Sequence, residues 1–218
     1  MLSYYQMYLE ENKKIKLILA SASPRRTDIL KLFQINFEVI PPFNCLEEKL
    51  ISPYDTVIKN SIKKSKNIFD YVKINKLPIL DSNNYNDILI CSFDTVVYFK
   101  NKYYLKPNDT NEAEKFLIDF SNKTHKVITG FCILSLNTNV MKTDVDETKV
   151  TFRKLNKEDI NWYLSKEYIL DKAGGYDING LGAFLVKKIN GCFYNVVGLP
   201  IYKFLKNLND LGYNLYNF

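Results

Sequence analysis

The segment at residues 17–26, LILASASPRR, constrains the fold of this chain more than any other. Residues 17–20 are a run of apolar or small side chains, which is typical of a strand buried on both faces. Polar residues then interrupt the run at 21–26, and residues 27–33 carry apolar side chains at helical spacing. The segment therefore predicts a buried strand, a tight polar loop and a helix.

The loop between this strand and helix has the composition of an anion-binding site. Ser21 and Ser23 offer hydroxyl groups, and Pro24 suits the first position of a helix. The N–H groups of the first helical turn have no partner within the helix, and the helix dipole is positive there. Arg25 and Arg26 add two planar guanidinium groups that match phosphate oxygens. A capped helix start with two solvated arginines is the alternative; a P-loop is excluded, because its glycines and its Gly-Lys-Ser/Thr end are absent.

The length and composition indicate one domain, or a two-lobed unit with one shared cleft. The chain has 218 residues, of which 46% are hydrophobic, and no apolar run reaches the roughly 18 residues of a membrane-spanning helix. Its net charge is +6, but the lysines are scattered, which favours a solvated surface over a nucleic-acid patch. The N-terminus lacks a secretory apolar stretch, and we expect a cytoplasmic protein without a membrane anchor. The four cysteines have no Cys-x-x-Cys spacing, so we expect them to be buried and reduced, with no zinc site.

Strands and helices alternate along the chain, which predicts an α/β fold. The expected strands are 17–20, 37–40, 88–91, 125–137 and 144–154, with a hairpin at 96–105 that turns at Asn101–Lys102. The expected helices are 27–33, 53–72, 110–121, 156–165 and 200–208. Residues 73–87 contain Pro, Asn and Asp and are expected to form a poorly ordered insertion loop. Five of the eight glycines fall within 174–191, which predicts tight turns and close backbone approaches.

Asp94 is the strongest candidate for catalysis. It follows the predicted buried strand 88–91, and ligands of open α/β sheets collect at the carboxyl ends of strands. Its carboxylate could hold a divalent cation or act as a base toward water; capping the following turn is an equally acceptable role. His125, the one histidine, has no nucleophile nearby in sequence, and a structural hydrogen bond is the favoured role for it.

Nine short motifs, in order along residues 15–206, resemble the Maf family of nucleoside triphosphate pyrophosphatases. They are SASPRR (21–26), EEKL (47–50), SIKKS (61–65), FDTVV (93–97), LKPND (105–109), SNKTHKVITG (121–130), ETKVTF (147–152), DKAGGYDING (171–180) and NVVGLP (195–200). Each motif is weak alone, but the ordered set is specific. The resemblance implies a mixed, twisted central sheet flanked by helices, two-lobed with a cleft, as in the inosine triphosphate pyrophosphatases.

The resemblance also assigns roles to residues of this chain. It implies Asp94 as the proton acceptor, Arg25 and Arg26 with Ser21 as phosphate-binding residues, and Lys64 and Lys106 as active-site lysines. The acidic residue near the metal corresponds to Glu47 or Glu48, and the sequence does not distinguish them; Asp94 completes the implied metal ligands.

Nucleotide selection in the family depends on three positions. Members that prefer dTTP and UTP have Arg, Thr and Gln there, and this chain has Arg25, Thr95 and Asn179. Asn179 keeps the side-chain amide but is one methylene shorter. A second departure is Ser92-Phe93 before Asp94, where the family usually has Gly-Ala; the larger Phe93 requires local repacking.

The resemblance implies a cytoplasmic homodimer that uses Mg²⁺ or Mn²⁺ to hydrolyse the α–β phosphate bond of dTTP, UTP or modified nucleotides. It implies an N-terminal extension at 1–14 and a single domain at 15–218. Two alternatives stay open. One is a purine house-cleaning pyrophosphatase that acts on inosine or xanthosine triphosphate, and the other is a regulator of cell division that binds nucleotides or nucleic acid without turnover. Neither membrane nor nucleic acid is an expected partner.

Overall fold

The computed structural model describes residues 14–75 and 85–214; residues 1–13, 76–84 and 215–218 lie outside the described part, and with them the predicted extension and most of the predicted insertion loop. The strands are β1 (Ile15–Leu19), β2 (Phe37–Val39), β3 (Asp87–Phe99), β4 (Lys102–Tyr104), β5 (Thr124–Ser135), β6 (Met141–Phe152) and β7 (Val186–Asn190). The helices are α2 (Pro24–Leu32), α3 (Pro53–Ile74), α4 (Thr110–Phe120), α5 (Lys157–Lys166), α6 (Phe193–Val197) and α7 (Ile201–Asp210), with short 3₁₀ helices η2 (Ala173–Gly175) and η3 (Leu181–Leu185).

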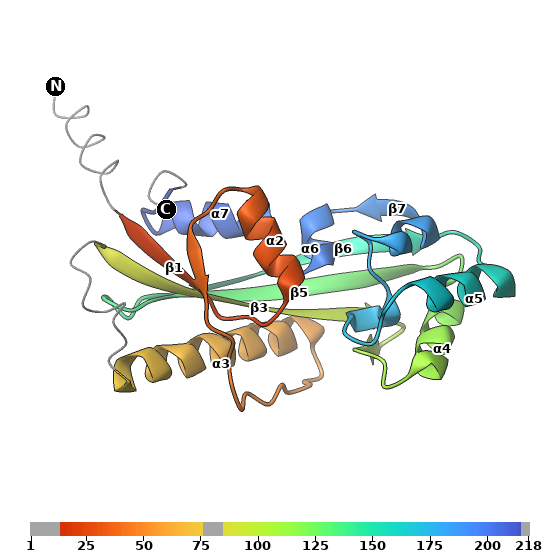
Figure 1. Cartoon of the computed structure of the whole chain (residues 1–218), viewed down its shortest axis with the longest axis horizontal. Helices are drawn as coiled ribbons and strands as arrows, with labels where there is room; N and C mark the ends of the chain where they lie inside the picture. Colours follow the sequence, from red (N-terminus) through yellow and green to blue (C-terminus); the bar gives the residue numbers. More distant parts are fainter. Residues whose placement is uncertain (1–13, 76–84, 215–218) are drawn as a thin grey trace, which may run out of the picture.

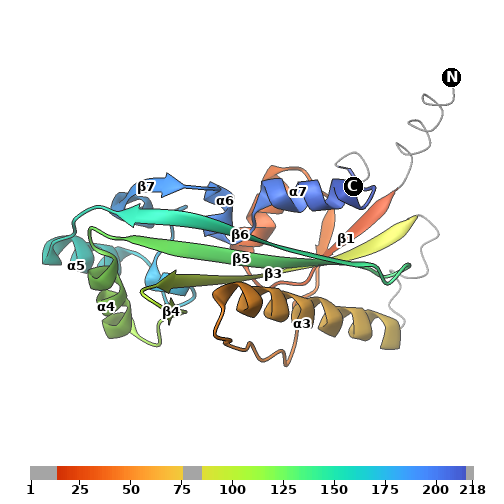
Figure 2. The same ribbon diagram turned by 180° about the vertical axis from the view of Figure 1, so that it is seen from behind.

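These strands form one mixed sheet in the order β2-β1-β3-β5-β6-β7, with β4 paired to β3. Strands β2, β1 and β3 are parallel, and β5, β6 and β7 continue the sheet antiparallel. The sheet is long and twisted, and the helices gather at its two ends: α2, α3 and α7 at one, α4 and α5 at the other (Figure 1). The view from behind shows the same arrangement (Figure 2). This confirms the predicted α/β fold with a mixed central sheet flanked by helices.

Alternate side chains of the central strands pack against different helices. Leu17 of β1 and Phe93 of β3 are fully buried in a core that includes Phe204 of α7. Ile18, the neighbour of Leu17, belongs instead to a core with Ile68 of α3. Because successive side chains of a strand point to opposite faces, neighbouring residues of β3 also face different helices.

Strand β3 has a gap along one of its edges. Strand β5 pairs with residues 89–98 on one edge, whereas β1 pairs with 87–91 and β4 with 97–99 on the other. No described strand covers residues 92–96 on that second edge. Asp94 and Thr95 lie in the middle of this gap, where side chains from both faces of the sheet reach the same open space.

Asp94 therefore lies inside a 13-residue strand, and the predicted end of this strand at residue 91 is wrong. The strand does not end at these polar residues: Asp94 and Thr95 line the open space over the gap, and the buried Ser92 bonds to Ser61 and Ser65 of α3. The strand end beside Asp94 is that of β1, which stops at Leu19. The rule that ligands collect at strand ends holds here for β1 and not for β3.

Other predicted elements have shifted ends. The hairpin turns at Lys100–Asn101, one residue earlier than predicted, since these two residues have φ of 48° and 59° as a type I′ turn requires. The helix predicted at 53–72 runs to Ile74, and the one predicted at 200–208 starts at Ile201 and runs to Asp210. Strand β7 and helix α6 lie within or after the glycine-rich stretch and were not predicted. They have few residues and no clear hydrophobic period.

The glycine-rich stretch makes the close backbone approach that its composition predicts. A Cβ atom added to Gly182 would lie 2.3 Å from the carbonyl oxygen of Asp177, so only glycine fits there. This contact folds residues 177–182 into a tight turn. As described below, Asp177 lines the main cleft.

Predictions from bulk composition agree in part with the structure. Cys91 and Cys132 are buried and Cys45 and Cys192 are half-buried; none of the four forms a disulfide. No helix in the described ranges is long and apolar enough to cross a membrane.

Candidate active site

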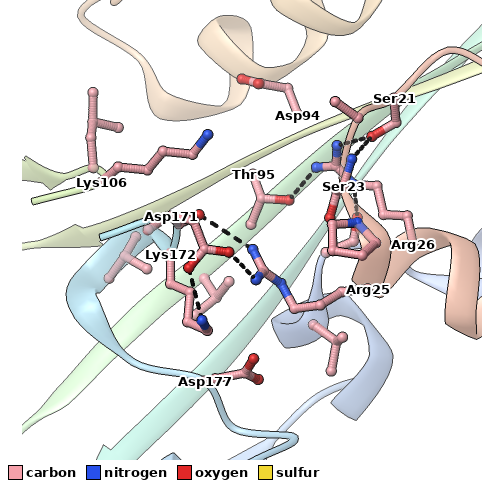
Figure 3. Close-up of a pocket in the computed structure, with 18 of the residues that line it drawn as sticks. Ser21, Ser23, Arg25, Arg26, Asp94, Thr95, Lys106, Asp171, Lys172 and Asp177 are labelled. Atoms are coloured by element: carbon pink, nitrogen blue, oxygen red, sulfur yellow. Dashed lines mark hydrogen bonds and ion pairs between the residues drawn. The ribbon is translucent and has the colours of Figure 1, made fainter. Parts of the chain in front are cut away.

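A cleft of about 670 Å³ lies over the gap in β3 (Figure 3). Its walls come from the start of α2, the segment after β2, α3, β3, the segment after β4, and residues 171–178 and 196–198. This volume is typical of small-molecule and cofactor sites, which span roughly 300–1,000 Å³. Of the sequence candidates, these line the cleft: Ser21, Arg25, Arg26, Glu47, Lys64, Asp94, Thr95 and Lys106.

Arg26 is held by three hydrogen bonds on one side of the cleft. Its Nε donates to the carbonyl oxygen of Gly198 at 2.8 Å, Nη1 to Ser21 Oγ at 3.0 Å and Nη2 to Thr95 Oγ1 at 3.1 Å. The ring centroid of Phe93 lies 5.7 Å from the guanidinium carbon, so the large residue that departs from the family pattern packs beside this arginine. Three of five N–H groups are used, and two remain for a ligand.

Arg26 stays charged despite its surroundings. Burial lowers its pKa to about 10, with Arg25 adding to the effect and the carboxylates of Asp94 and Glu47 opposing it. A guanidinium with this pKa is fully protonated at neutral pH. It is therefore a preorganised cation facing a cleft, which suits phosphate oxygens.

The hydroxyl of Ser21 completes this end of the cleft. Its Oγ accepts hydrogen bonds from Arg26 Nη1 and from the backbone N–H of Ser23 at 3.2 Å. No described residue accepts the hydroxyl hydrogen of Ser21, which is thus available to a ligand. Helix α2 begins at Pro24, three residues before the predicted range 27–33, and Pro24 takes the first helical position that suits it, so the first N–H groups of the helix also open toward this region.

Thr95 contacts Arg26 through a fixed chain of hydroxyl groups. Thr129 Oγ1 donates to the carbonyl oxygen of Asn195 at 3.1 Å, which uses its only hydrogen. The 3.0 Å contact between the Thr95 and Thr129 hydroxyls is therefore donated by Thr95. Thr95 has no hydrogen left for a nucleobase; in this structure it accepts from Arg26 and orients that guanidinium.

The opposite face of β3 carries a buried cluster of charges. Lys64 Nζ contacts Asp94 Oδ1 at 2.6 Å and Glu47 Oε1 at 2.7 Å. Asn60 Nδ2 donates to the second oxygen of Asp94, Oδ2, at 3.0 Å. Asp94 and Lys64 are 4% and 8% exposed, so this ion pair is held in a region of low dielectric where it is strong.

The two carboxylates of this cluster have opposite pKa shifts. Burial raises the pKa of Asp94 above its ordinary value, and the Glu47 carboxylate adds to this, while Lys64 and Asn60 oppose it. Burial also disfavours ionised Glu47, but the attraction and hydrogen bond of Lys64 outweigh it and lower the pKa of Glu47. The raised pKa of Asp94 fits a proton acceptor.

Lys106 lies near these groups with its ammonium directed into the cleft (Figure 3). Its positive charge contributes to the lowered pKa of Glu47. Within the described ranges, Lys106 Nζ has no hydrogen bond or ion pair. It is a free cation beside the carboxylates.

Arg25 points in another direction from Arg26. Its Nη1 donates to Asp171 Oδ2 at 2.9 Å, and Asp171 Oδ1 contacts Lys172 Nζ at 2.8 Å (Figure 3). Lys172 also lies 4.0 Å from Glu167 Oε1. Arg25 therefore bridges the cleft from α2 to the segment after α5, at a distance from the Asp94 cluster, instead of converging with Arg26 as the resemblance implies.

Two sequence candidates lie outside the cleft lining. Glu48 forms ion pairs of 2.7 Å with both Lys59 and Lys63 on the outer side of α3. These two lysines lower the pKa of Glu48 to about 2. Asn179 is exposed, and its backbone N–H donates to Asp177 Oδ1 at 3.0 Å. Of the adjacent acidic pair, the structure places Glu47 at the cleft and Glu48 away from it.

Sequence reasoning missed several residues of this site. Asn60, Asp171, Lys172 and Asp177 were not singled out, although the last three fall within a recognised motif. The sequence around Asn60 does not predict its role, because an asparagine on a lysine-rich helix is expected to be exposed to solvent. Its burial becomes visible only when α3 packs on β3.

The donor set of the cluster fits a hard divalent cation in part. Glu47 and Asp94 bring two carboxylates to one point, and Mg²⁺ is commonly bound by one or two carboxylates together with substrate phosphates. Within the described ranges, no group of three or more His, Cys, Asp or Glu side chains could hold a metal ion. The remaining ligands would have to be phosphate and water oxygens.

The fold and cleft together define an α/β protein with a site for a small polyanion, in which cations on both faces of one strand surround a carboxylate pair. The match of residues 16–211 to the model for Maf-like proteins shows that the chain belongs to that family. A Pyrococcus furiosus protein named dTTP/UTP pyrophosphatase is 44% identical over 203 residues, which are 92% of this chain and 97% of that protein. One of the same name from Caldicellulosiruptor saccharolyticus is 36% identical over 202 residues, 92% and 96% of the two chains. A solved structure, the Ham1 protein of Staphylococcus aureus, aligns at 12% identity over 63% of this chain and 71% of its own, with a TM-score of 0.40.

Proposed function

We propose that this protein is a nucleoside triphosphate pyrophosphatase that hydrolyses dTTP and UTP, or modified nucleotides, to the monophosphate and pyrophosphate. The observation that carries the proposal is the convergence of Arg26, Lys64 and Lys106 with Asp94 and Glu47 in one cleft. A triphosphate brings about four negative charges, which these three cations would offset in part. The names of the similar proteins support the choice of dTTP and UTP.

Binding of the triphosphate would depend on donors that have no partner in the described part of the chain. These are two N–H groups of Arg26, the hydroxyl hydrogen of Ser21 and the ammonium of Lys106. Arg26 is fixed by its hydrogen bonds before the substrate arrives, so it would lose little entropy when the substrate binds. Arg25 would hold the far side of the cleft through Asp171, where the sugar and base would lie.

Hydrolysis would require a water molecule in line with the bond between the α-phosphorus and the bridging oxygen. Asp94 would orient this water and accept its proton as the new phosphorus–oxygen bond forms. The bridging oxygen leaves with pyrophosphate, and Arg26, Lys64 and Lys106 stabilise the negative charge that develops on it.

A divalent cation, Mg²⁺ or Mn²⁺, is part of this proposal, with Glu47 and Asp94 as its protein ligands. Bound there, it would neutralise charge on the phosphate oxygens. The carboxylates accommodate hard cations, as described above, but substrate oxygens must complete the coordination.

The test is a panel of purified triphosphates that includes dTTP, UTP, ITP and xanthosine triphosphate, each with Mg²⁺ or Mn²⁺. We expect release of pyrophosphate and monophosphate, fastest with dTTP and UTP. Release of pyrophosphate from none of them would exclude the proposed activity. A preference for ITP would favour a purine house-cleaning enzyme, and salt-dependent DNA binding without turnover would favour a regulator.

We also propose, from family resemblance, that the protein is a cytoplasmic homodimer. Light scattering during size-exclusion chromatography would give twice the chain mass of 25.5 kDa for a dimer. A mass of one chain across micromolar concentrations would reject it.

A further inference from the structure

The segment between β2 and α3 is attached to α3 by two asparagine side chains. Asn67 Oδ1 accepts from the backbone N–H of Phe43, and its Nδ2 donates to the carbonyl oxygen of Phe43, both at 3.1 Å. Asn60 makes the same pair of bonds to Glu48, at 2.9 Å and 3.0 Å. The two asparagines are seven positions apart in α3, about two helical turns, and so lie on one face of that helix.

One further contact distinguishes Asn60 from Asn67. The second hydrogen of Asn60 Nδ2 is donated to Asp94 Oδ2 at 3.0 Å. Asn60 is 3% exposed, and its donors and its acceptor all have partners. A single side chain thus joins the backbone of Glu48 to the carboxylate of Asp94.

We propose that Asn60 is a positioning residue that fixes the Glu47-bearing segment against Asp94 and so sets the geometry of the two carboxylates on Lys64. Glu47 directly precedes the residue that Asn60 holds, and its side chain reaches the ammonium that Asp94 also contacts. The catalytic part of this inference rests on the proposed pyrophosphatase activity; the structural part does not.

The geometry separates catalysis from binding. Asn60 does not line the cleft, whereas the phosphate-facing groups Arg26, Ser21 and Lys106 do, and none of these contacts Asn60. Loss of Asn60 would leave Asp94 Oδ2 without its amide donor and the backbone of Glu48 without its two hydrogen bonds to α3, while the ion pairs of Glu47 and Glu48 with lysines of α3 remain. We therefore expect kcat to fall and the dissociation constant for nucleotide to stay nearly constant.

Asn60→Leu and Asn67→Leu form a matched pair for the test. Both replacements remove two hydrogen bonds to the same segment, with a side chain of similar size, but only the first removes a contact to Asp94. Positioning groups of this kind usually contribute tenfold to 100-fold, so we expect kcat to fall by about that factor in Asn60→Leu. In Asn67→Leu, kcat should stay within about twofold.

Amide hydrogen exchange measured by NMR gives a readout that needs no turnover. The N–H of Glu48 is bonded to Asn60 and the N–H of Phe43 to Asn67. Asn60→Leu should speed exchange at Glu48 and not at Phe43, and Asn67→Leu should do the reverse. Asn60→Asp keeps an acceptor for Glu48 but no donor for Asp94, so it should protect the Glu48 amide and still lower kcat.

Three outcomes would overturn the inference. They are a kcat of Asn60→Leu within twofold of the original protein, an equal fall in Asn67→Leu, or unchanged exchange at Glu48 in Asn60→Leu. If the unsubstituted protein hydrolyses no triphosphate, the proposed function fails on its own, and exchange at Glu48 still decides whether Asn60 holds the segment. Circular dichroism of each variant identifies a loss of fold.

Discussion

Asp94 divides its two carboxylate oxygens between two donors of different kinds. Lys64 contacts Oδ1 as a cation, and Asn60 contacts Oδ2 as a neutral amide. Burial makes the carboxylate more basic, whereas both donors stabilise its ionised form. The balance suits a group that must be ionised at rest and still accept a proton.

Asp94→Asn preserves the shape of this side chain but removes its basicity. We expect kcat for the preferred triphosphate to fall by about 10²–10⁴-fold, the usual contribution of a general base. Nucleotide affinity should change by less than about tenfold, or 1.4 kcal/mol, because the phosphate-facing cations are intact. Steady-state kinetics and titration calorimetry measure the two quantities, and a kcat near that of the original protein would contradict the role of Asp94.

Glu47 and Glu48 are adjacent in sequence and lie in different places in the structure. Glu47→Gln removes the second carboxylate from Lys64, so we expect at least a tenfold fall in kcat/KM and weaker activation by Mg²⁺. Glu48→Gln removes only ion pairs with Lys59 and Lys63 at the surface, which contribute little. Equal losses in the two variants, measured over a range of Mg²⁺ concentrations, would show that this distinction is false.

At the scale of elements, His125 connects strand β5 to the wall of the cleft. Its Nε2 lies 2.8 Å from the hydroxyl of Tyr176, which lines the cleft beside η2, and its ring stacks on Phe120 of α4 with centroids 4.2 Å apart. The ring is 1% exposed, and its Nδ1 has no hydrogen-bond partner in the described part of the chain. The structural role expected from the sequence agrees with this placement.

The pH dependence of stability follows from the burial of His125. Burial lowers its pKa to about 3 from the ordinary 6.5, so between these values the unfolded chain binds a proton that the folded chain does not. The free energy of unfolding is therefore fully retained above pH 6.5 and falls as the pH drops toward 3. At pH 5 this one residue should cost about 2 kcal/mol relative to neutral pH.

Urea unfolding of the original protein and of His125→Phe at pH 7.5 and pH 5 tests this expectation. The variant should lose about 2 kcal/mol less than the original between the two pH values. Equal losses in both proteins would mean that His125 is not the group responsible.

The elements themselves were largely predictable, and their ends less so. Helices α3, α4 and α5 have clear start signals, and the strand–loop–helix at 15–32 follows directly from its residue order. The strand predicted at 88–91 is much shorter than β3, because a polar interruption usually marks the end of a strand. Here it marks an edge without a neighbouring strand, a property of the assembled sheet and not of the local sequence.

At the scale of the whole molecule, β3 carries a second buried carboxylate besides that of Asp94. It lies at the start of the strand, at the end opposite the β3–β4 hairpin. Asp87 is 4% exposed and accepts hydrogen bonds from Ser135 Oγ at 2.7 Å and Tyr213 OH at 2.5 Å. Tyr213 follows α7, so this contact fixes the C-terminal part of the described chain to the start of β3. It lies apart from the residues that line the cleft.

Tyr213→Phe should therefore reduce stability without changing activity. Hydrogen bonds to charged groups contribute about 1.5–3 kcal/mol, and we expect a loss in that range by urea unfolding, with kcat/KM unchanged. Tyr202→Phe is the control, because Tyr202 is 73% exposed on the neighbouring helix and its hydroxyl should contribute little. A similar loss in both variants would count against a specific role of the Tyr213 contact.

The candidate site is assembled from segments between residues 21 and 198, and the sequence indicated most of its charged residues. Arg25 and Arg26 diverge because adjacent residues of a helix project about 100° apart. The sequence did not indicate their partners, Asp171 and Gly198, because these are far along the chain. Thr95 was assigned to base selection by resemblance, whereas its hydrogen bonds are to Arg26 and Thr129. Such roles depend on three-dimensional neighbours.

Because Asp94 and Thr95 are consecutive in β3, a single peptide bond separates the proposed proton acceptor from the hydroxyl that orients Arg26. Adding or deleting one residue between positions 88 and 94 would exchange the faces that the two side chains occupy. The carboxylate would then meet Arg26, and the hydroxyl would meet Lys64. The length of this one strand is thus as much a determinant of the chemistry as the identity of any side chain.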